Sequence, residues 1–563
     1  MERFRQGIAE VLAKLLGKSP ESLASLVEVP PAGVEGDLAF PCFALSKELR
    51  KNPAAVAADL ARGSFPPFVE WAKPAGAYLN FRLRGPELFR EVLAEAHAKG
   101  DAWGTSAGGA GRTAVVDFSS PNISKHLAFH HIRSTMIGQA LVKLHRACGW
   151  KTVGINHLGD WGTTFGQLMV AVAAWGGQDF LERAGLTDLN EMYVRFHKEA
   201  EADPALEEKA RAWFKRLEDR DPEAVRMWEA FRRISLEEFR RVYDRLGVSF
   251  DHVTGESFYL DRLDRTVALV EKAGITKESE GALIADLGEA MPPALLRKSD
   301  GATLYITRDL AAALYRFETF GFDRALYVTD AGQALHFRQL LKVLEAMKAP
   351  FAPRMAHVPF GVLLMDGRRG KSRKGEVVLL EDVLDEAVSR ALAIIQQKNP
   401  ALAAAGSVAE QVGIGAVVFH DLKNNRIKDV NFRWEEVLNL EGDSGPYVQY
   451  AHVRACGIFR KLEGGMPEAA EFALLGETEE RALARLLGRF PETVARACEA
   501  FEPSTLAQYL LEASAAFHRF HHAHRVLSDD RALSAARLWL VDAVRLTLRN
   551  GLHLLGMSAP VEM

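Results

Sequence analysis

The sequence has 563 residues, 48% hydrophobic and 26% charged, and this length exceeds one hydrophobic core and indicates about three or four domains. Its 70 lysines and arginines against 74 aspartates and glutamates give a formal net charge of −4, which excludes nucleic-acid binding by bulk charge but allows a local basic surface. No apolar run approaches the roughly 20 residues needed to cross a bilayer, which excludes a membrane-spanning helix.

Neither the amino terminus nor the cysteines indicate export or a structural metal. The first residues run into an amphipathic stretch with Glu10 and Lys14, without the apolar segment and cleavage site of a secretory signal. No CxxC pair occurs, so neither a zinc ribbon nor a disulfide framework is indicated. The cysteines are Cys42, Cys148, Cys456 and Cys498. We therefore expect a cytoplasmic protein with no metal of its own.

Residues 1–103 are expected to form a small α+β domain. The alternation of apolar and polar residues at 76–83 predicts a strand, and a helical pattern follows it to His97. The stretch 104–111 is rich in glycine and too flexible to pack well, which is typical of a joint between domains. We place the domain boundary there.

Residues 112–440 are expected to form an α/β domain. Strand patterns at 113–117 and 151–156 flank a stretch with helical spacing of its apolar residues, which predicts a βαβ unit. Such units bind ligands at the carboxyl ends of their strands. We therefore expect chemistry near Asp117 and Asn156.

Two further patterns complete the expected organisation. Residues 177–247 are charged and helical, which predicts a helical insertion within the α/β domain. Strand patterns return at 324–329 and 355–358 with a helix between them, so a doubly wound sheet is the simplest interpretation. Strand signals vanish from 441 to 563, where helical periodicity predicts a carboxyl-terminal bundle.

Polar residues follow the first strand of the α/β domain, where a helix amino terminus would attract phosphates. Turn chemistry alone would account for Pro121 and Asn122. The longer string 117–138, however, resembles the ATP-site signature of arginyl-tRNA synthetases, class I enzymes with a Rossmann-type catalytic domain. Other stretches that match this family are 156–166, 299–309, 336–339 and 445–454.

The resemblance covers essentially the whole chain. It implies a multidomain α/β fold: an N-terminal tRNA-contacting α+β domain, a Rossmann-type catalytic domain with a helical insertion, and a C-terminal all-α anticodon-binding domain. It also implies an arginine–tRNA ligase for protein synthesis, which activates L-arginine with ATP and Mg²⁺ and transfers it to the 3′ end of tRNA(Arg). Most family members need bound tRNA for activation, and a cytoplasmic monomer is expected.

Selection of arginine needs carboxylates that accept in pairs from the guanidinium, with neutral acceptors for the remaining protons. The residues that the resemblance assigns to this pocket are Asp117, Asn122, Tyr305, Asp309 and Gln339. Asp309 and Tyr305 would hold the guanidinium and the other three the amino-acid end. Asp309 also lies where an acidic residue in the first turn of a helix would complement the helix dipole. The two roles can coexist.

The first ATP motif of the family has the form His-x-Gly-His, whereas residues 128–131 here read Ala-Phe-His-His. His131 keeps the second histidine, while an alanine replaces the first and His130 replaces the glycine. His126 and His130 are alternative substitutes for the lost imidazole, and Lys125 offers a mobile cation. The residues expected to bind ATP are Ser119, Lys125, His131, Ser134 and His336. We expect Lys125, His130 and His131 to be catalytic.

The second ATP motif is matched loosely by a basic loop at 367–376, which carries five cations. Lys371, Arg373 and Lys374 in this loop are expected to stabilise the transferring phosphates. A solvated basic turn explains the charges equally well. A P-loop is disfavoured because Met365 stands where its first glycine belongs. A dinucleotide-dependent oxidoreductase is also disfavoured, because no GxGxxG motif follows a predicted strand.

The aromatic and basic segment 517–525 is expected to face RNA, where rings stack on bases and cations meet phosphates. A metal site at these histidines is disfavoured for lack of a cysteine or carboxylate ligand. The residues of the 445–454 stretch expected to bind tRNA are Tyr447, Gln449, Tyr450, His452 and Arg454. Because the first ATP motif is altered, two alternatives stay open: a ligase that loads another acceptor, and a non-catalytic tRNA-binding paralogue.

Overall fold

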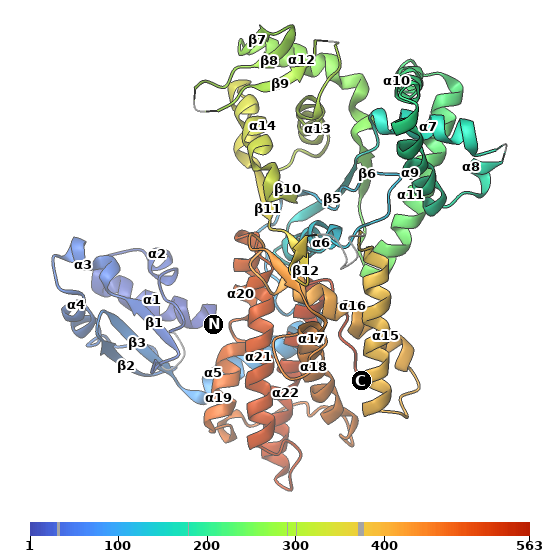
Figure 1. Ribbon diagram of the computed structural model, residues 1–563. Coiled ribbons are helices and arrows are strands. Elements are labelled where there is room, and N and C mark those ends of the chain that lie inside the picture. Colours follow the sequence, from blue (N-terminus) through green and yellow to red (C-terminus); the bar gives the residue numbers. More distant parts are fainter. Residues whose placement is uncertain (31–33, 178, 290, 300, 370–376) are drawn as a thin grey trace.

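The computed structural model describes residues 1–30, 34–177, 179–289, 291–299, 301–369 and 377–563. The chain forms an amino-terminal α+β domain, a central α/β domain and a carboxyl-terminal helical bundle (Figure 1). Among the described residues, no helix is both long and apolar enough to span a membrane. The predicted multidomain α/β fold class is confirmed.

The amino-terminal domain combines short helices with an antiparallel sheet of order β1-β3-β2, in which Leu38 pairs with Phe81. Its strands are β1 (Leu38–Pro41), β2 (Val69–Ala75) and β3 (Tyr78–Leu83). Its helices are α1 (Glu2–Leu16), α2 (Pro20–Ala24), α3 (Phe43–Leu49) and α4 (Pro53–Leu60). The predicted strand at 76–83 is β3. Helix α5 (Gly85–Lys99) and the 3₁₀ turn η1 (Gly100–Ala102) then lead to the central domain.

The central domain is built on a parallel five-stranded sheet of order β11-β10-β4-β5-β6. Its strands are β4 (Thr113–Asp117), β5 (Lys151–Leu158), β6 (His252–Gly255), β10 (Arg324–Asp330) and β11 (Met355–Phe360). The chain passes from β4 to β5 on one side and returns to β10 on the other. A switch point therefore lies between the carboxyl ends of β4 and β10, where open α/β sheets bind ligands.

Helices cover both faces of this sheet. Ala114 and Val116 belong to the core that contains α6, whereas Val115 packs with Leu310 of α13 and Leu340 of α14. The helices and 3₁₀ turns of this domain are α6 (His131–Ala147), α7 (Thr163–Trp175), η2 (Glu256–Arg262), α12 (Leu263–Lys272), α13 (Tyr305–Phe320), η3 (Ala331–Gln333), α14 (Ala334–Ala346) and η4 (Ala352–Arg354). The alternation of faces along β4 is the doubly wound arrangement predicted from the sequence.

Between β5 and β6 the chain makes the expected helical excursion, at the upper right of Figure 1. Its helices are α8 (Phe180–Arg183), α9 (Leu186–Ala202), α10 (Ala205–Glu218) and α11 (Pro222–Leu246). The last of these begins behind Asp221, whose carboxylate accepts from the backbone N–H of Glu223 and Ala224, and ends at Gly247 with a φ of 63°. It returns the chain to the sheet edge.

Two small sheets were not predicted. One is antiparallel, with β7 (Thr276–Ser279), β8 (Ala282–Ala285) and β9 (Ala294–Arg297). The other combines β12 (Leu363–Met365), β13 (Arg368–Arg369) and β14 (Val430–Phe432). Strands of two to four residues carry too few alternating positions for a sequence pattern to mark them.

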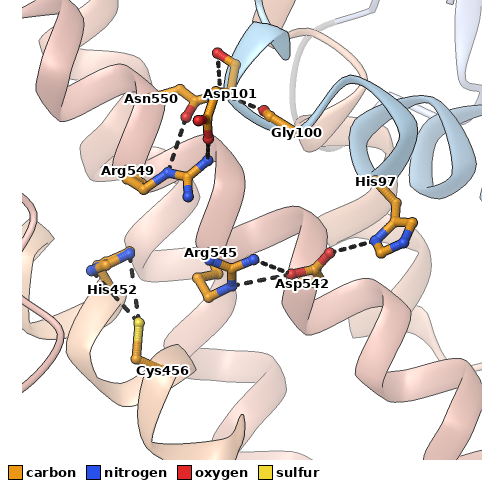
Figure 2. A network of polar contacts seen from close by, with 9 residues as sticks. All are labelled: His97, Gly100, Asp101, His452, Cys456, Asp542, Arg545, Arg549 and Asn550. Atoms are coloured by element: carbon orange, nitrogen blue, oxygen red, sulfur yellow. Dashed lines mark hydrogen bonds and ion pairs between the residues drawn. The ribbon is translucent and has the colours of Figure 1, made fainter. Parts of the chain in front are cut away.

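Helices α15 (Leu380–Lys398), α16 (Ala405–Leu422) and α17 (Trp434–Val437) lie within the range 112–440 that was expected to form the α/β domain. From residue 441 on, the described chain is helical, as predicted, with α18 (Gly445–Arg460), η5 (Phe472–Leu474), α19 (Thr478–Leu487), α20 (Phe490–Glu499), α21 (Ser504–Ala523) and α22 (Arg531–Leu554). Figure 2 shows how α22 is fastened to the segment that leaves the amino-terminal domain. Asp542 accepts from Arg545 and lies 2.9 Å from His97 Nδ1, while Arg549 forms an ion pair with Asp101.

Candidate functional site

A cavity of 460 Å³ lies at the switch point of the sheet, and we call it the switch-point cavity. Residues after β4, the first turn of α6 and the end of β10 line it. Its lining includes Ser119, His131 and Ser134, which were predicted to bind ATP, and His130, which was predicted to be catalytic. The structure therefore brings together three predicted ATP ligands and one predicted catalytic residue, at the position that an open α/β sheet uses for ligands.

The loop between β4 and α6 has an unusual backbone. Ser119, Ser120 and Ser124 have φ angles of 70°, 50° and 66°, in the left-handed region that non-glycine residues rarely adopt. Hydrogen bonds hold this loop: Ser119 N donates to Ser134 Oγ at 2.9 Å, and Ser134 Oγ donates to Val328 O at 2.7 Å. Such strain persists only where the surroundings fix it, and it clusters at functional sites.

The two histidines of the altered motif share the switch-point cavity. Their ring centroids are 4.3 Å apart. Burial, and then the neighbouring His130, lower the pKa of His131 to about 4. His131 Nδ1 lies 3.1 Å from Ala128 O, and because a carbonyl only accepts, Nδ1 carries the proton of the neutral ring. A phosphate at Nε2 would favour the doubly protonated form.

The other candidate imidazole lies elsewhere. His126 is absent from the lining of the switch-point cavity, and its Nδ1 is 3.4 Å from Glu238 Oε1. Its Nε2 lies 3.3 Å from Thr187 Oγ1. Of the two alternatives left open by the sequence, the geometry therefore favours His130 as the second imidazole.

A second cavity, of 510 Å³, adjoins the same loop, and we call it the lateral cavity. Asn122, Lys125 and Tyr305 line it, and Tyr305 is 65% exposed. The Lys125 Nζ lies 5.1 Å from the centroid of the Tyr193 ring. Asn122 bridges to Gly159, where a Cβ atom would lie 1.8 Å from Asn122 Oδ1, so only glycine fits there.

Two charged residues of the lateral cavity were missed from the sequence. Glu256 and Arg308 form an ion pair there. Burial raises the pKa of Glu256 to about 7, although the Arg308 guanidinium opposes the rise. Glu256 directly follows β6, so the rule that ligands bind at the carboxyl ends of strands would have indicated it once that strand was recognised.

The carboxylates predicted for the arginine pocket already have partners. Asp309 Oδ2 lies 2.6 Å from His336 Nε2, so the predicted ATP ligand His336 sits with an arginine-pocket residue. Asp117 Oδ2 lies 2.7 Å from Arg316 Nη1, and Asp117 Oδ1 accepts from Ser120 Oγ at 2.9 Å. Neither Asp117 nor Asp309 lines the lateral cavity. Burial lowers the pKa of His157, and the charges of Asp117 and Asp309 oppose this shift.

Gln339 is turned toward a neighbouring loop. Its Nε2 donates to Pro292 O at 2.9 Å and to Pro293 O at 3.1 Å. The predicted catalytic residues of the basic loop, Lys371, Arg373 and Lys374, lie outside the residues that the structure describes.

An aromatic and basic surface joins α18 to α21. The Tyr447 ring lies 5.0 Å from the His518 ring, and Arg454 Nη1 lies 3.2 Å from His518 Nδ1. Arg454 also donates to Tyr450 Oη at 3.1 Å. A hollow of 830 Å³ beside it is lined by Tyr450, Arg454 and further residues that include His521. Rings and cations interleaved in this way suit unstacked bases and phosphates.

Two of the predicted tRNA contacts do not fit their positions. Gln449 and His452 are 0% and 1% exposed, and both face the inside of the bundle. Gln449 Nε2 donates to Ser558 O at 2.9 Å, and His452 Nδ1 donates to Pro560 O at 2.9 Å. Their side chains hold the segment after α22, so a direct contact with RNA is corrected to a packing role.

The burial of His452 predicts a pH dependence of stability. Burial lowers the pKa of His452 to about 4. Between pH 6.5 and 4, this histidine is therefore protonated in the unfolded chain but neutral in the folded chain. The free energy of unfolding therefore falls as the pH drops from 6.5 toward 4, by linkage of about one proton. In His452→Gln, urea midpoints at pH 7, 6 and 5 should decline less steeply than in the wild type; equal slopes would contradict this assignment.

Comparisons with known proteins agree along the whole chain. The model of "tRNA synthetases class I (R), catalytic domain" matches residues 94–434, and that of "DALR anticodon binding domain" matches residues 448–563. The model of "Arginyl tRNA synthetase N terminal domain" matches residues 2–83. All three descriptions concern aminoacyl-tRNA synthetases or their anticodon recognition.

Full-length relatives give the same result. The chain is 45% identical to an arginine–tRNA ligase of Exiguobacterium sibiricum and 43% identical to one of Clostridioides difficile, with 100% of each chain covered. Its structure matches that of the Thermus thermophilus arginyl-tRNA synthetase with a TM-score of 0.82 and 30% identity, over 99% of both chains. The chain therefore belongs to the arginyl-tRNA synthetases, the class I family of arginine–tRNA ligases.

Proposed function

We propose that the chain activates L-arginine with ATP to arginyl-adenylate and transfers the arginine to the 3′ end of tRNA(Arg). The observation that carries the site assignment is the loop between β4 and α6. It lines the switch-point cavity with Ser119 and His130 and the lateral cavity with Asn122 and Lys125. ATP in the first cavity and arginine beside the second would meet across this loop.

ATP is assigned to the switch-point cavity, with Ser119, Ser134 and His131 as ligands and His336 nearby at Asp309. Lys125, His130, His131 and the basic-loop residues Lys371, Arg373 and Lys374 would stabilise the charge that develops on the α-phosphate. The arginine carboxylate attacks this phosphorus, and pyrophosphate leaves. Mg²⁺ would bind together with the ATP phosphates. Among the described lining residues Asp330 is the one carboxylate, and Mg²⁺ bound to a nucleotide usually needs only one or two carboxylates beside the phosphates.

Arginine is assigned to the region where the lateral cavity meets α13. Asp309 and Tyr305 would hold the guanidinium, while Asn122, Asp117 and Gln339 would hold the amino-acid end. His336 beside Asp309 keeps that carboxylate oriented. This division separates the charged end of the substrate, which decides specificity, from the carboxylate that reacts.

The tRNA anticodon is assigned to the surface of Tyr447, Tyr450, Arg454 and His518, where Arg454 contacts both Tyr450 and His518. The amino-terminal domain would contact the body of the tRNA. A monomer in the cytoplasm is part of the same proposal, as is a need for bound tRNA during activation.

The direct test is charging of total tRNA with labelled arginine by the purified protein, with ATP and Mg²⁺. Lysine controls for positive charge alone, glutamine for a shorter side chain with a neutral amide, and citrulline for the length and planar shape of arginine without its charge. We expect arginine to be charged and the three controls to remain near background. Tight binding of tRNA without any charging would contradict the ligase assignment.

A further inference from the structure

The last helix of the insertion reaches the ATP site. Tyr243 lies near the carboxyl end of α11 and is 6% exposed. Its hydroxyl oxygen is 2.8 Å from Ser119 Oγ and 3.2 Å from Asn156 Nδ2. We propose that Tyr243 is a positioning residue that holds the strained Ser119–Ser120 segment of the switch-point cavity in the form that binds ATP. This inference rests on the proposed function of that cavity.

The direction of every hydrogen bond in this chain of groups is fixed. Thr135 Oγ1 donates its one proton to His131 O at 2.7 Å, so it must accept from Ser119 Oγ, 2.8 Å away. Because Ser119 Oγ donates its only proton to Thr135 Oγ1, it must accept a hydrogen bond from the Tyr243 hydroxyl. Burial, which raises the pKa of Tyr243 to about 12, keeps that proton in place.

The other end of the chain holds the second strained residue. The Tyr243 oxygen accepts from Asn156 Nδ2, so the orientation of this fully buried amide is set. Asn156 Oδ1 then accepts from Ser120 N at 3.1 Å. Tyr243 thus constrains Ser119 through its hydroxyl and Ser120 through Asn156.

These two serines have φ angles of 70° and 50° and line the cavity with His131, whose carbonyl ends the same chain. Without the Tyr243 hydroxyl, Ser119 Oγ loses a donor, and the Asn156 amide loses the contact that orients it. The strained backbone can then relax toward ordinary angles, which displaces the groups around the nucleotide. The residues on α13 assigned to the guanidinium lie outside this chain, whereas Asp117, assigned to the amino-acid end of arginine, accepts from Ser120 Oγ at 2.9 Å.

Another contact from the same helix supports the assignment. Ser235 Oγ accepts from the backbone N–H of Ser124 at 2.8 Å and donates to Phe231 O at 2.6 Å. Ser124 is the third residue of the loop with a positive φ, of 66°. Helix α11 therefore supports both ends of the strained segment, from two positions on one of its faces.

The test uses Tyr243→Phe in the full-length protein. The Phe ring keeps the packing against Phe250, whose ring centroid is 5.0 Å away, and only the hydroxyl is lost. We expect kcat for arginine-dependent exchange of pyrophosphate into ATP, with tRNA present, to fall on the order of 10- to 100-fold. The KM for ATP should rise by a clearly larger factor than the KM for arginine, which is affected only through the bond of Ser120 Oγ to Asp117.

The matched control is Tyr509→Phe, in the helical bundle. Tyr509 is 3% exposed and its hydroxyl donates to Leu486 O at 3.0 Å, so this variant also loses one buried hydroxyl hydrogen bond. Similar melting temperatures of the two variants, with kinetics changed in Tyr243→Phe alone, would support a positioning role. Thr135→Val removes the hydroxyl that accepts from Ser119 Oγ. This variant should likewise raise the KM for ATP by a larger factor than the KM for arginine.

The inference is overturned if Tyr243→Phe keeps both kcat and the KM for ATP within twofold of the wild type. It is also overturned if the KM for arginine rises by as large a factor as the KM for ATP, as a general loosening of the domain would cause. The wild-type protein separates this result from a failure of the proposed function, because a wild type that does not charge arginine would contradict the ligase assignment itself.

Discussion

Replacing Asp309 with asparagine is expected to lower kcat/KM for arginine in tRNA charging on the order of 100- to 1,000-fold. A guanidinium presents several donors in a planar fork, and a carboxylate accepts two of them with a full charge. An asparagine keeps one acceptor oxygen and turns an NH₂ group toward the remaining donors. Losing one partner of such a pair costs about 2–5 kcal/mol, and a 100- to 1,000-fold loss, about 2.7–4.1 kcal/mol, lies within that range.

The design separates recognition of arginine from general damage. Glu318→Gln is the matched control, because Glu318 lies on the same helix and pairs with the surface residue Arg265 at 2.8 Å. An exposed pair of this kind contributes little, so the control should charge arginine like the wild type. A rise in the KM for ATP with an unchanged KM for arginine would contradict the assignment of Asp309 to the guanidinium.

The parallel sheet was predictable because its strands are buried on both faces and stand out as short apolar runs. The strands expected at 113–117, 151–156, 324–329 and 355–358 correspond to β4, β5, β10 and β11. The edge strand β6 escaped notice since His252 and Val253 at its start are exposed, which interrupts the apolar pattern.

The candidate site was found where its residues are local in the sequence. Ser119, His130, His131 and Ser134 come from one loop and one helix turn, so a single motif indicates them together. Tyr243 lies 124 residues from Ser119 and looks like any apolar position of an amphipathic helix. Its hydroxyl gains a role only through the fold that brings α11 to the end of β4.

The prediction of tRNA contacts failed in part for a reason already present in the sequence. Positions 447, 450 and 454 lie on one face of a helix, whereas 449, 452 and 456 lie on another. The motif was assigned to RNA as a unit, although a helix presents only one of these faces to a ligand. The helical period would have separated Tyr447, Tyr450 and Arg454 from Gln449 and His452.

Replacing His130 with alanine is expected to slow formation of arginyl-adenylate on the order of 100-fold, as the loss of one donor to a developing oxyanion does. His130 lines the switch-point cavity beside His131, so the two rings can share the phosphate region although residue 128 is alanine. The measurement is arginine-dependent pyrophosphate exchange in the presence of tRNA.

The comparison variant is His126→Ala, which removes the other imidazole that the sequence offered. Its ring bonds to Glu238 and Thr187 rather than lining the switch-point cavity, so its loss should lower the rate less than tenfold. The reverse order of the two effects would assign the phosphate contact to His126 and would require the loop to rearrange when ATP binds. Equal and large losses would contradict the assignment of the phosphate contact to His130 alone.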